Sequence, residues 1–153
     1  MSPEARERVF AQLKIDEGVV NEIYLDHLGY PTLGVGHLIV EGDLEHGMNV
    51  GTEISEERVR TLFSVDLNTA IDECEILYDD DWQSFPEEVQ EILVNLMFNC
   101  GRTRLSKFKN MNAALGERDW IRASEEMVDS LWYRQVGARA ERLVERMSNV
   151  KTG

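Results

Sequence analysis

Two carboxylic acids and a hydroxyl near the start of the chain have the types and spacing that a reaction could use. Eight residues separate Glu17 from Asp26, and five separate Asp26 from Thr32. Cleavage of a glycosidic bond needs two acids in different surroundings. A protonated one gives its proton to the leaving oxygen, and an ionised one activates a water or stabilises positive charge. A nearby hydroxyl can hold that water, so the three residues are a candidate catalytic set, although acids in turns are also common as plain surface residues.

The elements expected around these residues indicate which of the two acids is protonated and which is ionised. Ser2 is a capping hydroxyl that predicts the start of a helix, and Gly18 predicts its end. Glu17 would then lie at a helix C-terminus beside apolar residues, where burial and the helix dipole both favour the protonated acid. Asp26 follows the alternating run 19–25 and would lie in a turn, solvated and ionised. Glu17 is thus the predicted general acid, and Asp26 the predicted ionised partner.

The rest of the chain predicts a small sheet followed by helices. Residues 19–40 are rich in β-branched and aromatic side chains and are punctuated by glycine and proline, as short strands are. Residues 41–54 are acidic, contain three glycines and predict a loop. Apolar residues then recur at helical spacing, and the predicted helices are 55–78 before a solvated loop at Asp79-Asp80-Asp81, 86–100, and about 106–115, 118–129 and 138–148.

This order of elements is typical of the α+β class. We expect a single domain over residues 1–153, with a small β lobe at about 19–54 and a larger helical lobe at about 55–150 that includes the N-terminal helix. A cleft between the two lobes is the natural place for a polysaccharide. The length is sufficient for one real hydrophobic core.

The composition excludes several classes of protein. No apolar run of about eighteen residues exists, so no stable membrane insertion is predicted, and the first residues show no apolar secretion signal. Cys74 and Cys100 lack metal spacing and are expected to be free thiols. His27, His37 and His46 form no pair with the spacing of metal ligands. We therefore expect no metal, no cofactor and no nucleic-acid partner.

Charge is distributed unevenly along the chain. The formal net charge is −13, yet residues 1–100 carry 5 Lys and Arg against 22 Asp and Glu, whereas residues 101–153 carry 11 against 7. The C-terminal third is thus a basic region on an acidic protein, and such asymmetry can orient a charged polymer. A solvated surface tuned for solubility or a salty medium explains the same pattern equally well.

The stretch from Glu17 to His37 resembles the catalytic segment of the phage-type lysozymes, the family typified by the T-even phage enzyme. That family has a glutamate in Asp-Glu-Gly, then an aspartate, then Gly-x-x-Thr-Ile-Gly-x-Gly-His. Here the last part reads Gly29-Tyr-Pro-Thr-Leu-Gly-Val-Gly-His37. The resemblance covers roughly residues 9–148, and Asn95-Leu-Met-Phe-Asn-Cys-Gly101 and Trp132-Tyr133 resemble later family segments.

The resemblance implies supporting contacts for the catalytic set. It implies that His37 and Asp66 form a buried ion pair that joins the lobes, where the alternative is a surface histidine. It also implies that two arginines on the last helix pair with Glu17 and with the acid before it. The residues at these positions are Arg139, Arg142 and Asp16.

The resemblance also implies contacts with the sugar chain. Leu38 and Phe98 match family positions that contact sugar, although either could be plain core. Met111 and Glu126 fall at two further contact positions and depart from the family residues. The segment between His37 and Ser55 is shorter than in the T-even enzyme. These departures bear on which cell walls are recognised and leave the catalytic set unchanged.

The function that the resemblance implies is that of a monomeric lysozyme acting on bacterial peptidoglycan. Such a muramidase cuts the β-1,4 bond between N-acetylmuramic acid and N-acetylglucosamine, with inversion, and without a cofactor. The expected setting is a phage endolysin that accumulates in the host cytoplasm and reaches the wall after release by a holin, or else a virion-associated enzyme. The alternatives are a lytic transglycosylase, which needs no water-holding aspartate, and an inactive wall-binding or virion structural module.

Overall fold

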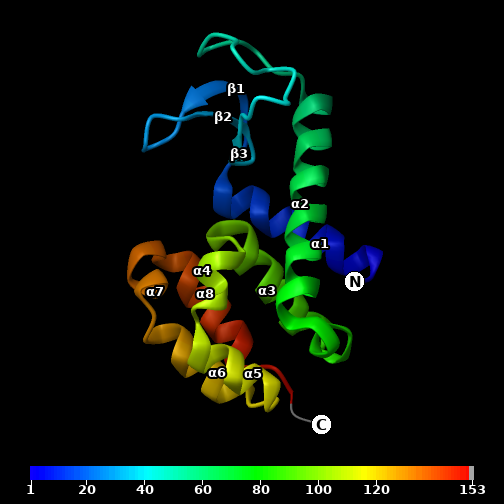
Figure 1. Cartoon of the computed structure of the whole chain (residues 1–153), viewed down its shortest axis with the longest axis vertical. Helices are drawn as coiled ribbons and strands as arrows, with labels where there is room; N and C mark the ends of the chain where they lie inside the picture. The colour runs from blue at the N-terminus through cyan, green and yellow to red at the C-terminus, as the bar shows by residue number, and fades with distance from the viewer. Residues whose placement is uncertain (152–153) are drawn as a thin grey trace. The chain divides into compact units, whose positions relative to one another are not determined.

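The computed structural model describes residues 1–151, and for Leu131 and Gln135 it describes the backbone alone. Three short strands follow the first helix, and helices make up most of what remains (Figure 1). The elements in chain order are α1 (Pro3–Glu17), β1 (Val20–Leu25), β2 (Pro31–Gly34), β3 (His37–Leu38), α2 (Glu56–Tyr78), the 3-10 helix η1 (Asp79–Ser84), α3 (Glu87–Cys100), α4 (Arg102–Ser106), α5 (Lys109–Gly116), α6 (Trp120–Val128), α7 (Leu131–Val136) and α8 (Ala138–Ser148). The α+β class expected from the sequence is confirmed.

Two compact units make up the chain. The first comprises residues 7–69 and is called the sheet unit; the second comprises residues 1–6 with residues from 70 onward and is called the helical unit. The boundary between them falls within α1 and within α2. The organisation as a single domain with a substrate cleft stays a prediction.

The sheet unit is built on a three-stranded antiparallel sheet in the order β1-β2-β3. Tyr24 of β1 lies opposite Thr32 of β2, and Thr32 lies opposite Leu38 of β3. Their neighbours Ile23 and Leu33 are 1% and 0% exposed. Successive side chains of a strand point to opposite faces, so one face of the sheet carries core residues and the other carries the row that contains Thr32.

Helices α1 and α2 cover the core of the sheet unit. Ser55 accepts a hydrogen bond from the Arg58 amide at 3.1 Å, the N-terminal cap that the sequence predicts for α2. The rings of Phe10 and Phe63 meet edge to face with centroids 4.5 Å apart. Val59 packs so closely against β2 that a methyl group added at Gly34 would lie 2.9 Å from it. These contacts hold α1 and β2 against the same helix, α2.

The helical unit is organised around α3. Every residue of α3 from Val89 to Met97 is buried. The helix ends at Gly101, whose φ of 80° suits a residue without a side chain. The side chain of Trp132 donates to Asn99 Oδ1 at 2.9 Å. The two later segments that carry the family resemblance therefore touch each other.

Three segments of the helical unit differ from what the sequence predicts. Residues 79–84 form the 3-10 helix η1 where the sequence predicts a solvated loop, because Trp82 within it is buried and holds the segment against the core. The helix predicted at about 106–115 corresponds to α5, which begins a few residues later, and the short helix α4 before it was not predicted. Helix α7 was not predicted. No helix in the described part of the chain is both long and apolar enough to cross a membrane.

Candidate active site

The three candidate catalytic residues all belong to the sheet unit. Glu17 is the last residue of α1, Asp26 follows the last residue of β1, and Thr32 lies within β2. Glu17 and Asp26 are half-buried, and Thr32 is 4% exposed. A helix end, a hairpin and a strand thus each contribute one side chain.

The turn between β2 and β3 faces the Glu17 carboxyl group. A methyl group built on Gly36 would lie 3.3 Å from Glu17 Oε2, which is tighter than most contacts of this kind. Gly36 also has a φ of +65°, a conformation that side chains rarely adopt. Two features therefore favour glycine at position 36: its positive φ, and the space that the Glu17 carboxyl group occupies.

The hairpin between β1 and β2 orients Asp26. Its Oδ1 atom accepts hydrogen bonds from the backbone amides of Leu28 and Tyr30, each at 2.9 Å. Its own amide donates to the Tyr30 carbonyl oxygen at 2.9 Å. The two bonds to the carboxylate, with the backbone bond that closes the turn, hold Asp26 in a single orientation.

The same carbonyl oxygen connects Thr32 to Asp26. Thr32 Oγ1 donates to the Tyr30 carbonyl oxygen at 2.9 Å. The hydroxyl and the carboxylate therefore belong to one short hairpin, and their joint action stays a prediction.

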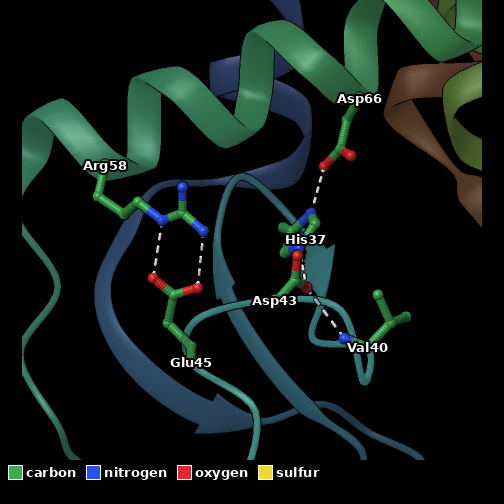
Figure 2. Close-up of polar contacts among 6 residues, drawn as sticks. All are labelled: His37, Val40, Asp43, Glu45, Arg58 and Asp66. Atoms are coloured by element: carbon green, nitrogen blue, oxygen red, sulfur yellow. Dashed lines mark hydrogen bonds and ion pairs between the residues drawn. The ribbon is translucent and has the colours of Figure 1, made fainter.

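His37 lies between two carboxylates (Figure 2). Its Nδ1 atom is 2.6 Å from Asp66 Oδ2, and its Nε2 atom is 2.8 Å from Asp43 Oδ2. The hydrogen bond with Asp66 raises the pKa of His37 to about 9; burial opposes this shift, and the bond with Asp43 adds to it. The structure thus brings together His37 and Asp66, as the resemblance implies, within the sheet unit.

Asp43 was not among the residues predicted from the sequence. The oxygen of Asp43 that contacts His37 also accepts a hydrogen bond from the Val40 amide at 3.0 Å. Burial works against ionisation of Asp43, but the bonds from Val40 and His37 outweigh it and hold the pKa of this carboxyl below its usual value. The Gly-Asp pair at 42–43, a turn signal close after a histidine, was the available hint.

A second ion pair fastens the same loop to α2. Arg58 donates from Nε and a terminal nitrogen to the two oxygens of Glu45, at 2.8 and 3.0 Å (Figure 2). Glu45 is 5% exposed. A two-point contact of this kind fixes both distance and orientation. The loop that the sequence presents as irregular is therefore anchored at Asp43 and at Glu45.

The other predicted site residues lie in both units. Asp16 accepts a hydrogen bond from Gln12 at 3.1 Å, and Leu38 is 47% exposed. Arg139 is buried and donates from Nε to Asn95 Oδ1 at 2.9 Å. Phe98 is half-buried, and Arg142 is exposed on α8. The predicted pairing of the arginines with Glu17 and Asp16, and the sugar contacts of Leu38 and Phe98, stay predictions.

A basic pocket of about 400 Å³ lies in the helical unit between α4, α5 and the end of α6. Met111 and Glu126, the two sugar-contact positions at which the chain departs from the family residues, line this pocket. Its other lining residues are Arg104, Lys107, Phe108, Lys109, Asn110, Asp129 and Ser130. Within the described residues, no cluster of three or more His, Cys, Asp or Glu side chains could hold a metal ion.

The chain belongs to the phage lysozyme family, whose model matches residues 14–149. It is 29% identical to the pre-baseplate central spike protein Gp5 of Enterobacteria phage T4 over 86% of this chain and 26% of the spike protein. It is also 29% identical to a "Probable T4-type lysozyme 2" of Dictyostelium discoideum, over 86% of this chain and 88% of that protein. A peptidoglycan hydrolase, gp36 of Pseudomonas phage phiKMV, is 27% identical over 86% of this chain and 14% of the phage protein. The chain thus spans a small part of the two phage relatives and most of the Dictyostelium protein.

Proposed function

We propose that the protein is a peptidoglycan hydrolase of the muramidase type, which cuts the β-1,4 bond between N-acetylmuramic acid and N-acetylglucosamine. The observation that carries the proposal is the arrangement of Glu17, Asp26 and Thr32 in one compact unit, with Asp26 and Thr32 joined through one backbone carbonyl. Membership of the phage lysozyme family supports it. So does the name of the phiKMV relative, which states that protein's substrate.

Glu17 acts as the general acid in the proposed reaction. Its proton passes to the glycosidic oxygen as the bond from that oxygen to the sugar carbon breaks. A water held by Asp26 and Thr32 attacks the same carbon from the opposite face, and Asp26 takes up the proton that the water loses. The result is hydrolysis with inversion.

Two biological settings fit this reaction. An endolysin would collect in the host cytoplasm and reach the wall after release by a holin. A virion-associated enzyme would act during entry, and the similarity to the T4 spike protein favours this second setting. In either setting we propose that the protein acts as a monomer, with the peptidoglycan as its partner.

Mass spectrometry of the products from purified peptidoglycan tests the proposed reaction. Hydrolysis adds one water and leaves reducing N-acetylmuramic acid ends. Anhydromuramic ends would identify a lytic transglycosylase instead. Binding to the wall without any product would identify an inactive wall-binding or structural module.

A further inference from the structure

The turn between β2 and β3, together with β3 itself, lies next to two members of the catalytic set. A methyl group built on Gly36 would lie 3.3 Å from Glu17 Oε2, so the turn lies against the carboxyl group of the acid. Leu38, two residues further along, lies opposite Thr32 in the sheet. His37 is the residue between these two positions in the chain. A movement of His37 would therefore disturb the surroundings of both Glu17 and Thr32.

The backbone of this segment has little to hold it in place. Strand β3 consists of two residues, His37 and Leu38, whereas β1 has six. The turn before it contains Gly34 and Gly36, both with positive φ, and glycine leaves the backbone more freedom than any other residue does. A two-residue strand forms few ladder hydrogen bonds, so we expect the side chain of His37 to contribute much of the hold on the turn.

Two carboxylates bind the His37 ring at different nitrogens (Figure 2). Nδ1 is 2.6 Å from Asp66 of α2, and Nε2 is 2.8 Å from Asp43 of the loop after β3. The pKa of His37 is about 9, so the ring is charged at neutral pH and both nitrogens donate. A ring held at one nitrogen can swing about that contact, whereas a ring held at both nitrogens has a fixed orientation.

Asp43 is itself held firmly in the loop. Its amide donates to the Val40 carbonyl oxygen at 2.9 Å, and its carboxylate accepts from the Val40 amide at 3.0 Å. Its side chain is 15% exposed, and that of His37 is 12% exposed. The contact between them is therefore largely shielded from water and has a rigid support on the side of the loop.

We propose that Asp43 is a positioning residue for the hydrolytic reaction, which holds His37 from the loop and thereby keeps the turn at Gly36 against the Glu17 carboxyl group and β3 beside Thr32. The proposal rests on the proposed function. Asp43 acts through His37 and takes no part in the transfer of protons. A general acid must be aimed at the leaving oxygen, and a misplacement of about 1 Å can cost about 100-fold in rate.

The substitution Asp43→Ala removes the contact with His37 and leaves Asp66 in place. We expect kcat on a soluble peptidoglycan oligomer of defined length to fall about tenfold, with KM within about twofold, because the aim of the acid matters most in the transition state. The rates are measured well below the melting temperature of each variant, so that the protein is folded. Asp43→Asn keeps an oxygen that can accept from His37 and should retain most of the parent kcat.

Two further variants separate this role from a general loss of stability. Glu88→Ala removes an ion pair of the helical unit, in which Arg146 Nε donates to Glu88 at 2.6 Å, and should lower the melting temperature while keeping the parent kcat. Glu45→Ala removes the contact with Arg58 that anchors the same loop, and should lower kcat much less than Asp43→Ala does. A parent-like kcat in folded Asp43→Ala would overturn the proposal, and so would an equal loss of kcat in Glu45→Ala.

Nuclear magnetic resonance of the Gly36 amide tests the position of the turn without any substrate. In folded Asp43→Ala the amide resonance should shift and its hydrogen should exchange faster with solvent, whereas in Glu88→Ala both should match the parent. A Gly36 amide that is unchanged in Asp43→Ala would overturn the proposal. If the parent hydrolyses peptidoglycan and Asp43→Ala is equally active, only the role of Asp43 fails. If the parent releases no products, the proposed function fails, and with it the role of Asp43 in the reaction.

Discussion

Asp26 and Thr32 meet at a single backbone oxygen, the Tyr30 carbonyl, which accepts from the amide of one and the hydroxyl of the other. A change in the hairpin that moves this carbonyl would therefore move both residues of the proposed water-holding pair. Glu17 comes from a separate element and is bounded by the turn at Gly36. The site is built from short local contacts, which explains why a short stretch of sequence carries most of its information.

Loss of the His37 imidazole should destabilise the protein in a pH-dependent way. His37→Asn should reduce the free energy of unfolding by roughly 1–3 kcal/mol near pH 6, because two carboxylates lose their cationic partner and Asp66 keeps partial access to water. The folded-state pKa of His37, about 9, lies above its ordinary value of 6.5. Its contribution is therefore full below pH 6.5 and lost as pH rises through 9. Urea unfolding from pH 5 to 10 measures it.

Asp43 determines how the free energy of unfolding changes at acid pH. Its pKa is depressed, so its contribution is present above its ordinary value and disappears as pH falls through the folded-state value. His46→Asn is the matched control, because His46 is exposed in the same loop. Equal unfolding free energies for His37→Asn and His46→Asn at every pH would show that the cluster contributes nothing to stability.

In the turn between β2 and β3, a side chain at position 36 should reduce both stability and activity. Gly36→Ala should lose about 1 kcal/mol of stability from its positive φ, and most of its wall-lysing activity because the new methyl group meets the Glu17 carboxyl. Gly47→Ala carries the same backbone penalty at φ +85° with nothing within 4 Å. It should lose similar stability and keep its activity. Thermal melts and turbidity assays compare the two, and equal activities would mean that Gly36 makes no room for the acid.

The elements predicted correctly are those with local signals. Ser2 and Ser55 cap α1 and α2 as expected, and the termini of α3 and α8 follow their apolar periods. Helix α7 was missed although Ser130 caps it, because six residues are too few to show a helical period. The 3-10 helix η1 was missed because three successive aspartates suggest exposure, and only the tertiary burial of Trp82 shows otherwise.

The contacts of the site likewise separate into those with a local signal in the sequence and those that depend on tertiary structure. The catalytic set, His37 and Asp66 follow from motif spacing and resemblance. Asp43 and the Glu45–Arg58 pair depend on how a loop folds back onto α2, and a loop without periodicity gives no signal for that path. The register that places Tyr24 beside Thr32 depends on a bulge in β1, which the strand pattern does not reveal.

The net charge of the protein should make the lysis of intact walls depend on salt concentration. A protein with a net charge of −13 is repelled by an anionic wall, so added salt should first increase lysis by screening that repulsion. The lysines of the basic pocket should offset the repulsion locally. Lys107→Glu with Lys109→Glu should slow lysis of intact walls about tenfold at low salt and leave cleavage of a short neutral oligosaccharide nearly unchanged.

The matched control makes the same change in net charge elsewhere. Arg122→Glu with Arg134→Glu alters two exposed residues that do not line the pocket. If this pair slows lysis as much as the lysine pair does, net charge alone governs the approach to the wall. If neither pair has an effect, the charge asymmetry is a solvated surface. Losses on both substrates would indicate damage to the site or the fold.

The substitution Glu17→Gln tests whether Glu17 is the general acid, because it keeps the shape of the side chain and removes the proton that the leaving oxygen requires. The measurement is the amount of reducing N-acetylmuramic acid released from purified peptidoglycan, by mass spectrometry, with a thermal melt of the same sample. We expect release below about 1% of the parent rate from a protein that melts at or above the parent temperature, since a half-buried acid has been removed. A folded Glu17→Gln protein that releases these products at more than a few per cent of the parent rate would contradict it.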